Sequence, residues 1–288
     1  MNTLAAGLSL GILVGANAWA DPVGRLVAAH DANTLGSNLA NADAARFAVN
    51  VAAYLTQGGG NRLLLIETEP PFASHDYAPS VEAALIDAGF DLTVVDARLP
   101  APSFEGFDAV FVGIAARDDF RVPDAGAFGD YIRAGGGAYV FSGVGSDRIE
   151  EAAALNTMIG DFGILFDSGC GPGNGCYNGV NGVAVDPAAH PIFEGITTLL
   201  SGNGQFMEVT TGQVVAAVNG SAVYAVAEVM PCNPADLASP FGLLDLADIT
   251  TFVAAFLAMS PTADLVPDDL FDLADINAFV LAFVGGCP

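Results

Sequence analysis

The sequence predicts an α/β protein in which a parallel β-sheet carries helices on both faces, followed by a small all-α module. Three features of the 288-residue chain carry this prediction. Apolar runs typical of strands alternate with stretches typical of helices from residue 21 to residue 230. A short segment is then duplicated within residues 231–288, and an apolar run occupies much of residues 1–20. We therefore expect a leader, an α/β domain and a C-terminal module.

The leader has the pattern of a signal peptide. An apolar run covers residues 4–16, and Ala18-Trp19-Ala20 fits the small-x-small rule for cleavage before Asp21. Neither Lys nor Arg precedes the run, so a buried N-terminal helix is the alternative. Elsewhere the sequence has no apolar stretch of the roughly 18–20 residues that a transmembrane helix needs. We expect a protein that is secreted and lies in the extracellular space or at the cell surface.

The α/β domain, residues 21–230, is predicted from its alternating elements. The continuous apolar run at 62–67 is typical of a strand buried on both faces, and Gly89 ends a helix as its C′ residue. Strands are expected over 25–30, 62–67, 92–95, 109–113 and 138–142, and helices over 41–57, 79–88 and 124–134. Further strands at 183–185, 205–209, 214–218 and 223–229 are expected to close the sheet.

The charge balance excludes one class of partner. The chain has 33 acidic side chains against eight basic ones, all of them Arg and none after Arg148, which gives a formal net charge of −25. Phosphate contacts need cationic side chains, so this chain repels nucleic acid and anionic membrane surfaces. A hydrophobic content of 52% excludes a wholly disordered chain.

The four cysteines are expected to form disulfides rather than a metal site, because export favours oxidation. Four cysteines allow three pairings. Cys170 and Cys176 lie in one Gly-rich loop, so a local bridge is expected there, which leaves Cys232 to pair with Cys287.

The C-terminal module, residues 231–288, contains an internal repeat. Residues 235–249 recur as residues 263–276, and each copy is followed by apolar residues at helical spacing. The apolar positions are Ile249, Phe252, Val253, Phe256 and Leu257 in the first copy and Ile276, Phe279, Val280, Phe283 and Val284 in the second. We expect two helices that bury these stripes against each other.

The loop before each helix is rich in aspartate, and two interpretations are open. In the second copy Asp264, Asp268, Asp272 and Asp275 occupy positions 1, 5, 9 and 12 of a twelve-residue loop, the spacing of an EF-hand-like Ca²⁺ site. The first copy has only Asp236, Asp245 and Asp248, so its Ca²⁺ site is expected to be weak or empty. In the second interpretation, Asp245 and Asp248, like Asp272 and Asp275, cap the following helices and need no ion.

Two Asp-rich loop-helix repeats, with Cys232 before them and Gly286-Cys287-Pro288 at the end, resemble a dockerin module of the planctomycete type. The resemblance implies paired Ca²⁺-binding loops and attachment to a cohesin-like protein. It also implies that residues near the helix starts face the partner, namely Thr250, Thr251, Asn277 and Ala278.

The α/β domain resembles the class I glutamine-amidotransferase-like fold, a flavodoxin-like three-layer arrangement. The resemblance rests on residues 131–145 and on His190-Pro-Ile-Phe-Glu-Gly195, and the opening His30-Asp31-Ala-Asn resembles uncharacterised relatives of that fold. Catalytic members carry a Cys on a Gly-flanked turn after the corresponding strand. Ser142 stands in that slot between Val140 and Val144, so the tight nucleophile turn is absent.

Three functions remain open at this point. The favoured one is an exported modular protein that docks to an extracellular assembly through its tail, while its α/β domain binds a ligand or partner without catalysis. The alternative is a secreted hydrolase of glycans or amides, acting for example in polysaccharide catabolism, with Ser142, His190 and Glu194 as its catalytic residues. The third is a purely adhesive surface protein.

Overall fold

The fold is described from a computed structural model that covers ten stretches of the chain. These are residues 24–36, 41–67, 77–96, 103–114, 125–142, 148–168, 176–177, 181–201, 204–238 and 241–287. The expected signal peptide, residues 1–20, lies outside them.

Five parallel strands form one half of the main sheet, in the order β3-β2-β4-β5-β1. They are β1 (Gly24–Ala29), β2 (Arg62–Glu67), β3 (Asp91–Asp96), β4 (Ala109–Ile114) and β5 (Gly137–Ser142). Each coincides to within about one residue with a strand expected from the sequence. Apolar runs of this kind are predictable because both faces of such a strand are buried.

The other half of the sheet is antiparallel, so the sheet is mixed and the expected parallel arrangement is confirmed in part. Its members are β6 (Ile164–Phe166), β11 (Met207–Val209), β12 (Gln213–Val218) and β13 (Ser221–Val229). The strand β13 pairs with β1 from Gly24↔Val229 to Ala29↔Tyr224. Asn219 and Gly220 join β12 to β13 with φ values of 52° and 84°. A two-residue Asn-Gly turn with positive φ makes a hairpin, so these strands cannot run in parallel.

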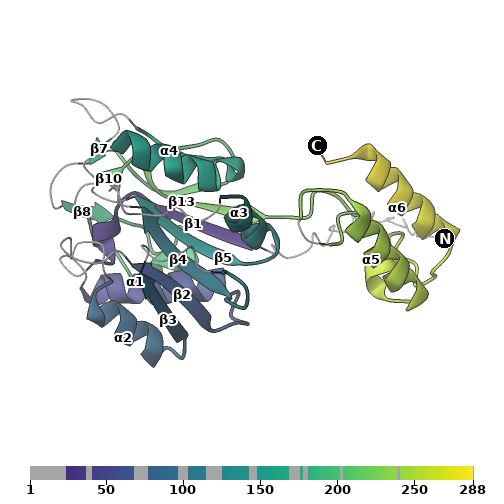
Figure 1. Cartoon of the computed structure of the whole chain (residues 1–288), viewed down its shortest axis with the longest axis horizontal. Helices are drawn as coiled ribbons and strands as arrows, with labels where there is room; N and C mark the ends of the chain where they lie inside the picture. The colour runs from purple at the N-terminus through teal and green to yellow at the C-terminus, as the bar shows by residue number, and fades with distance from the viewer. Residues whose placement is uncertain are drawn as a thin grey trace, which may run out of the picture.

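Helices cover both faces of the sheet (Figure 1). The helices α1 (Ala42–Leu55) and α2 (Pro79–Asp87) pack on one face, and α3 (Ala125–Arg133) and α4 (Arg148–Ile159) pack on the other. Side chains alternate along β1. Val27 packs in the core between the sheet and α1 and α2, and Leu26 packs in the core between the sheet and α3 and α4. The remaining short elements are η1 (Ala32–Thr34), η2 (Gly160–Phe162), η3 (Pro191–Phe193), β7 (Cys176–Tyr177), β8 (Asn181–Ala184), β9 (Thr198–Ser201) and β10 (Gly204–Gln205).

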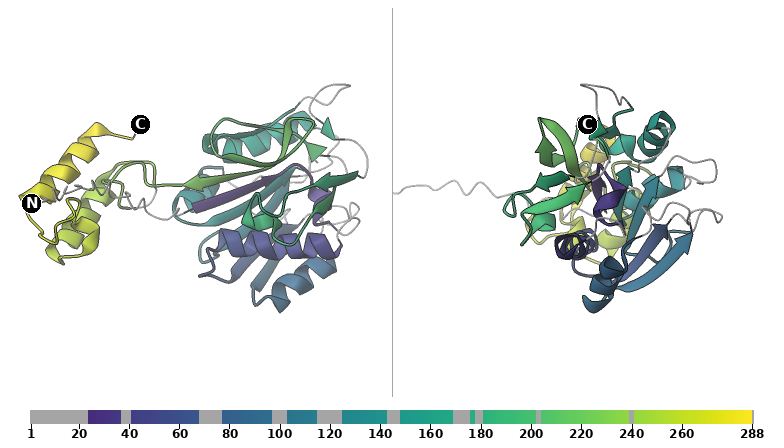
Figure 2. Two further views of the ribbon diagram at one scale, coloured as in Figure 1. Left: turned by 180° about the vertical axis from the view of Figure 1, so that it is seen from behind. Right: turned by 90° about the vertical axis from the view of Figure 1, so that its left-hand side faces the viewer.

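The C-terminal module contributes α5 (Leu246–Leu257), η4 (Pro261–Ala263) and α6 (Leu273–Gly285). Figures 1 and 2 show these helices beyond the end of β13, apart from the sheet. The rings of Phe252 and Phe279 stack with centroids 4.1 Å apart, and a disulfide joins Cys232 to Cys287 as expected. No helix in the described stretches has the length and apolarity to cross a membrane.

The predicted apolar stripes are only half buried. Phe252 and Phe279 face the module core at 4% and 5% exposure, but Leu257 and Val284 are 77% and 79% exposed. The helices meet along their phenylalanines, so the aliphatic side of each stripe is turned outward. The expectation that each whole stripe is buried was therefore wrong.

Candidate functional site

The structure does not bring the three candidate catalytic residues together. Ser142 ends β5, where its hydroxyl donates to the carbonyl of His30, just after β1. His190 packs its ring against Tyr54 with centroids 4.7 Å apart, and the Tyr54 carbonyl accepts from Arg25 at the start of β1. The serine and the histidine therefore lie at opposite ends of β1. Glu194 is exposed and sits close in the chain to His190. This arrangement does not support a Ser142 triad.

His190 belongs instead to a structural cluster at the amino end of β1. Arg25 lies over the Tyr54 ring, 4.6 Å from its centroid, and pairs with Glu228 at 3.5 Å. The Tyr54 hydroxyl donates to the same carboxylate at 3.0 Å. Burial lowers the pKa of His190, against the opposing charge of Glu228. His190 Nδ1 accepts the N–H of Ile192 at 3.4 Å, so the ring caps η3 in a neutral form.

A different polar group occupies the carboxyl end of β1, where open parallel sheets place their ligand sites. His30 Nε2 lies 2.6 Å from Ser201 Oγ, and that hydroxyl donates to Asp31 Oδ2 at 2.9 Å. His30 Nδ1 lies 3.1 Å from the carbonyl oxygen of Val223. A Cβ on Gly204 would collide with the His30 carbonyl, so only glycine lets this backbone approach so closely. We call His30, Asp31 and Ser201 the buried relay.

Both nitrogens of the His30 ring are engaged in the buried relay. Nδ1 donates to the Val223 carbonyl, and Nε2 shares a hydrogen with Ser201 Oγ. Burial lowers the pKa of His30, while the neighbouring charge of Asp31 raises it.

The buried relay is a structural network in this conformation. His30, Asp31 and Ser201 are each 0% exposed, and so is Ser142 beside them. No reacting group can reach Ser201 Oγ, because the side chain is fully buried. The relay ties β1 to β9 and β13 across the end of the sheet.

In the C-terminal module the aspartates behave as helix caps. Asp245 and Asp272 are the N-cap residues of α5 and α6, and each forms a capping box with Asp248 or Asp275. Asp248 Oδ1 also accepts the N–H groups of Leu237 and Ala238 at 2.7 and 2.8 Å. Both copies thus close the loop onto the first turn of the helix.

The second loop is closed in the same way. Asp275 Oδ1 accepts the N–H of Val266 at 3.0 Å, and Asp275 Oδ2 accepts the N–H of Asp272 at the same distance. Asp264 accepts from Asp268 and Asp269 at 3.3 and 3.1 Å. The Asp268 carboxylate accepts from Leu270 at 2.9 Å.

These loops do not fit Ca²⁺ as they stand. Ca²⁺ needs six to eight oxygens converging on one point, whereas these carboxylates converge on backbone N–H groups. Position 3 carries Ala238 in one copy and Val266 in the other, and each offers its N–H to the last aspartate of its loop. Within the described stretches no three aspartates of the module bring their oxygens within 4.8 Å of one another. In this structure the aspartates therefore cap the helices and close the loops.

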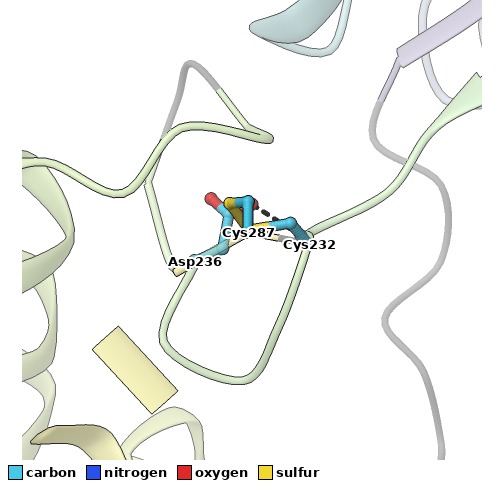
Figure 3. Close-up of side chains that lie close together, drawn as sticks. All are labelled: Cys232, Asp236 and Cys287. Atoms are coloured by element: carbon cyan, nitrogen blue, oxygen red, sulfur yellow. Dashed lines mark hydrogen bonds between the residues drawn. A yellow bond between two sulfur atoms is a disulfide. The ribbon is translucent and has the colours of Figure 1, made fainter. Parts of the chain in front are cut away.

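The one group of possible metal ligands in the described stretches is Cys232, Asp236 and Cys287. Figure 3 shows the Asp236 carboxylate beside the disulfide. The Cα atoms of the two cysteines are 5.3 Å apart, and the bridge joins residues 55 positions apart, at the two ends of the module. The other expected bridge is not tested, because Cys170 and the side chain of Cys176 lie outside the described part of the chain.

Each helix of the module also carries a row of exposed aliphatic side chains. We call these the outer apolar rows, and their exposures run from 48% to 79%. They are Leu246, Val253 and Leu257 on α5 and Leu273, Val280 and Val284 on α6. The predicted partner-facing residues lie on the same helices: Thr250 and Asn277 are exposed, and Thr251 and Ala278 are half-buried.

Comparisons with protein-family models, with curated proteins and with solved structures returned no match. Sequence reasoning missed the buried relay, because Ser201 is 170 positions from Asp31 in the chain and no local pattern links them. It also missed the outer apolar rows. Their signal was an apolar stripe too wide for the contact between two short helices.

Proposed function

We propose that this chain is an exported modular protein whose C-terminal module attaches it to a protein partner through the outer apolar rows. The exposed aliphatic side chains of α5 and α6 are the observation that carries this proposal. Exposed apolar surface of this kind on a small module marks an interaction site, because apolar surface in contact with water raises the free energy of the protein. The resemblance to dockerins points to a cohesin-like partner on a cell surface or in an extracellular assembly.

The charge of the module favours a particular partner chemistry. Residues 231–288 contain eight aspartates and no Lys, Arg or His. A second copy of the module would bring the same negative charge, and helices that lie on membranes are rich in Lys and Arg. A protein with an apolar surface bordered by basic side chains complements the module in both respects.

For the α/β domain we propose binding of a ligand or partner without catalysis. Ser142 is buried and hydrogen-bonded at the end of the sheet away from His190. The buried relay is likewise closed to solvent. These observations do not favour the hydrolase alternative.

The test compares partner capture by full-length chains that differ only on the module surface. Leu257→Asp with Val284→Asp places a charge in each outer apolar row. The matched control is Ile86→Asp on α2, where an aliphatic side chain is 58% exposed on the α/β domain. Burying one such side chain is worth roughly 1.5–3 kcal/mol, so the double variant should lose about tenfold or more in affinity.

The panel of probes is a set of purified cohesin modules, measured by surface binding at fixed ionic strength. We expect at least one cohesin to bind the parent and the Ile86→Asp chain and to release the double variant, with weaker binding at high salt. Equal binding by all three chains, or no binding by the parent, would contradict the proposal.

A further inference from the structure

The Cys232–Cys287 disulfide lies beside a buried carboxylate oxygen that lacks a partner. Asp236 is 2% exposed, and its Oδ2 accepts the N–H groups of Cys232 and Gly242, both at 2.7 Å. Its other oxygen, Oδ1, forms no hydrogen bond. Buried polar atoms are nearly always satisfied, so an orphaned one needs a physical reason.

The surroundings of this carboxylate suggest that reason. One Asp236 oxygen and the two sulfur atoms all lie within 4.8 Å of one another (Figure 3). Around a tetrahedral Zn²⁺, with bonds of about 2.3 Å to sulfur and about 2.0–2.2 Å to oxygen, neighbouring ligands are roughly 3.5–4 Å apart. The two sulfurs are bonded to each other in the disulfide, and their Cα atoms are 5.3 Å apart. Reduction would let the sulfurs separate to this spacing beside the carboxylate.

We propose that reduction of the Cys232–Cys287 disulfide creates a site for a borderline-soft divalent cation, with both thiolates and the Asp236 carboxylate as ligands. Zn²⁺ suits this donor set best, because it combines thiolate with carboxylate and takes water in a fourth position. The ends of the module then stay joined whether the cysteines are oxidised or reduced.

The chemistry has two balanced steps. A phosphine reductant transfers two electrons to the sulfur–sulfur bond and becomes its oxide, taking one oxygen from water. The two hydrogens of that water protonate the two sulfurs. Metal binding then releases both thiol protons to solvent, since only thiolates are ligands.

The internal repeat provides a matched control for Asp236. With the offset of 28 that aligns Asp236 with Asp264, the position of Cys232 is taken by Ser260. Both oxygens of Asp264 accept backbone N–H groups, and no cysteine is grouped with it. Asp264→Asn therefore repeats the chemical change of Asp236→Asn without touching the proposed ligands.

The experiment uses the full chain with Cys170→Ser and Cys176→Ser, so that two thiols remain. The chain is reduced with a water-soluble phosphine, desalted without oxygen and titrated with Co²⁺. We expect a thiolate-to-cobalt charge-transfer band that saturates at one Co²⁺ per chain and disappears when Zn²⁺ is added. Asp236→Asn should weaken binding at least about tenfold, since even outer-shell changes cost that much. Asp264→Asn should leave the affinity unchanged.

Three outcomes would overturn the proposal: no band, a band of equal strength in the unreduced chain, or equal affinities for the two Asn variants. Asn keeps an oxygen that can accept from Cys232 and Gly242, and circular dichroism checks that the variant folds. If it does not fold, X-ray absorption of the Zn²⁺-loaded parent decides. Two sulfur neighbours with oxygen support the site, and a shell without sulfur refutes it.

Discussion

In the α/β domain most large apolar side chains of the sheet are buried on both faces, whereas in the C-terminal module most of those on the helices are exposed. Twelve of the seventeen exposed large apolar side chains in the described stretches lie between Leu243 and Val284. The module's fully buried apolar set is Ala235, Phe252, Ala263 and Phe279. A core this small contributes little to the free energy of folding, so a disulfide and aspartate caps supply much of the module's stability. The module is thereby folded without using its outer surface.

The largest expected effect tests the small core of the module. Phe252→Ala removes one ring of the central stack and should cost about 3–5 kcal/mol, which is enough to unfold the module alone. Hydrogen exchange should show α5 and α6 losing protection while β1 and β5 keep theirs. Leu257→Ala on the same helix is the control, with an expected change within about 0.5 kcal/mol. Loss of protection throughout the chain would mean that the two parts fold as one unit.

The next effect belongs to the α/β domain. Ser201→Ala removes the hydroxyl that joins His30 to Asp31 and should destabilise this domain by roughly 1–3 kcal/mol, because polar groups are left buried. Urea unfolding followed by circular dichroism measures the loss. Ser260→Ala in the module is the control and should leave the α/β transition in place. An unchanged midpoint for Ser201→Ala would show that the relay contributes no stability.

The next effect concerns the aspartate caps of the module. Asp248→Ala removes the acceptor of three backbone N–H groups and should destabilise the module by about 1–2 kcal/mol. Because these N–H groups occupy the place of a cation, we expect the same melting temperature in Ca²⁺ and in EDTA. A clear rise in melting temperature with Ca²⁺ would show that the loops rearrange around the ion.

The smallest effect is the acid sensitivity of the module. Backbone N–H groups of Asp272 and Val266 lower the pKa of Asp275, so the ionised form is favoured by folding. Its contribution is complete above the unfolded pKa, about 3.9, and is lost as the pH falls through the folded value. Asp236 acts in the opposite direction, because burial raises its pKa. Between pH 5 and pH 3 the melting temperature of α6 should depend less on pH in Asp275→Asn than in the parent. An equal pH dependence in the two chains would contradict this assignment.

Much of the α/β fold was predictable because its signals are local. The five parallel strands are apolar runs, and Gly89 ends its helix with a φ of 95°. The short strands β6 and β9 were not predicted, since runs of three or four residues are too short to show the two-residue alternation of a strand. The antiparallel half was readable from Asn219-Gly220, a turn signal that the regular alternation of strands and helices obscured.

The site residues were less predictable than the elements. The loop spacing in the module fitted a cation and helix caps equally well, and only the N–H groups of Ala238 and Val266 distinguish the two. The disulfide between Cys232 and Cys287 was expected because Cys170 and Cys176 share one loop, which left these two cysteines to pair. The orphaned oxygen of Asp236 could not be inferred, because it depends on how the chain ends pack around it.

The pairing of β13 decides how the chain would carry mechanical load. A force applied through the module enters at Cys232, three residues after β13 ends at Val229. It then pulls β13 lengthwise against β1, to which β13 is paired over six residues, and against β12 on its other side. Hydrogen bonds loaded in this shear geometry must break together rather than one at a time. A protein held by its tail would thus be loaded through β13, a strand that is hydrogen-bonded on both sides.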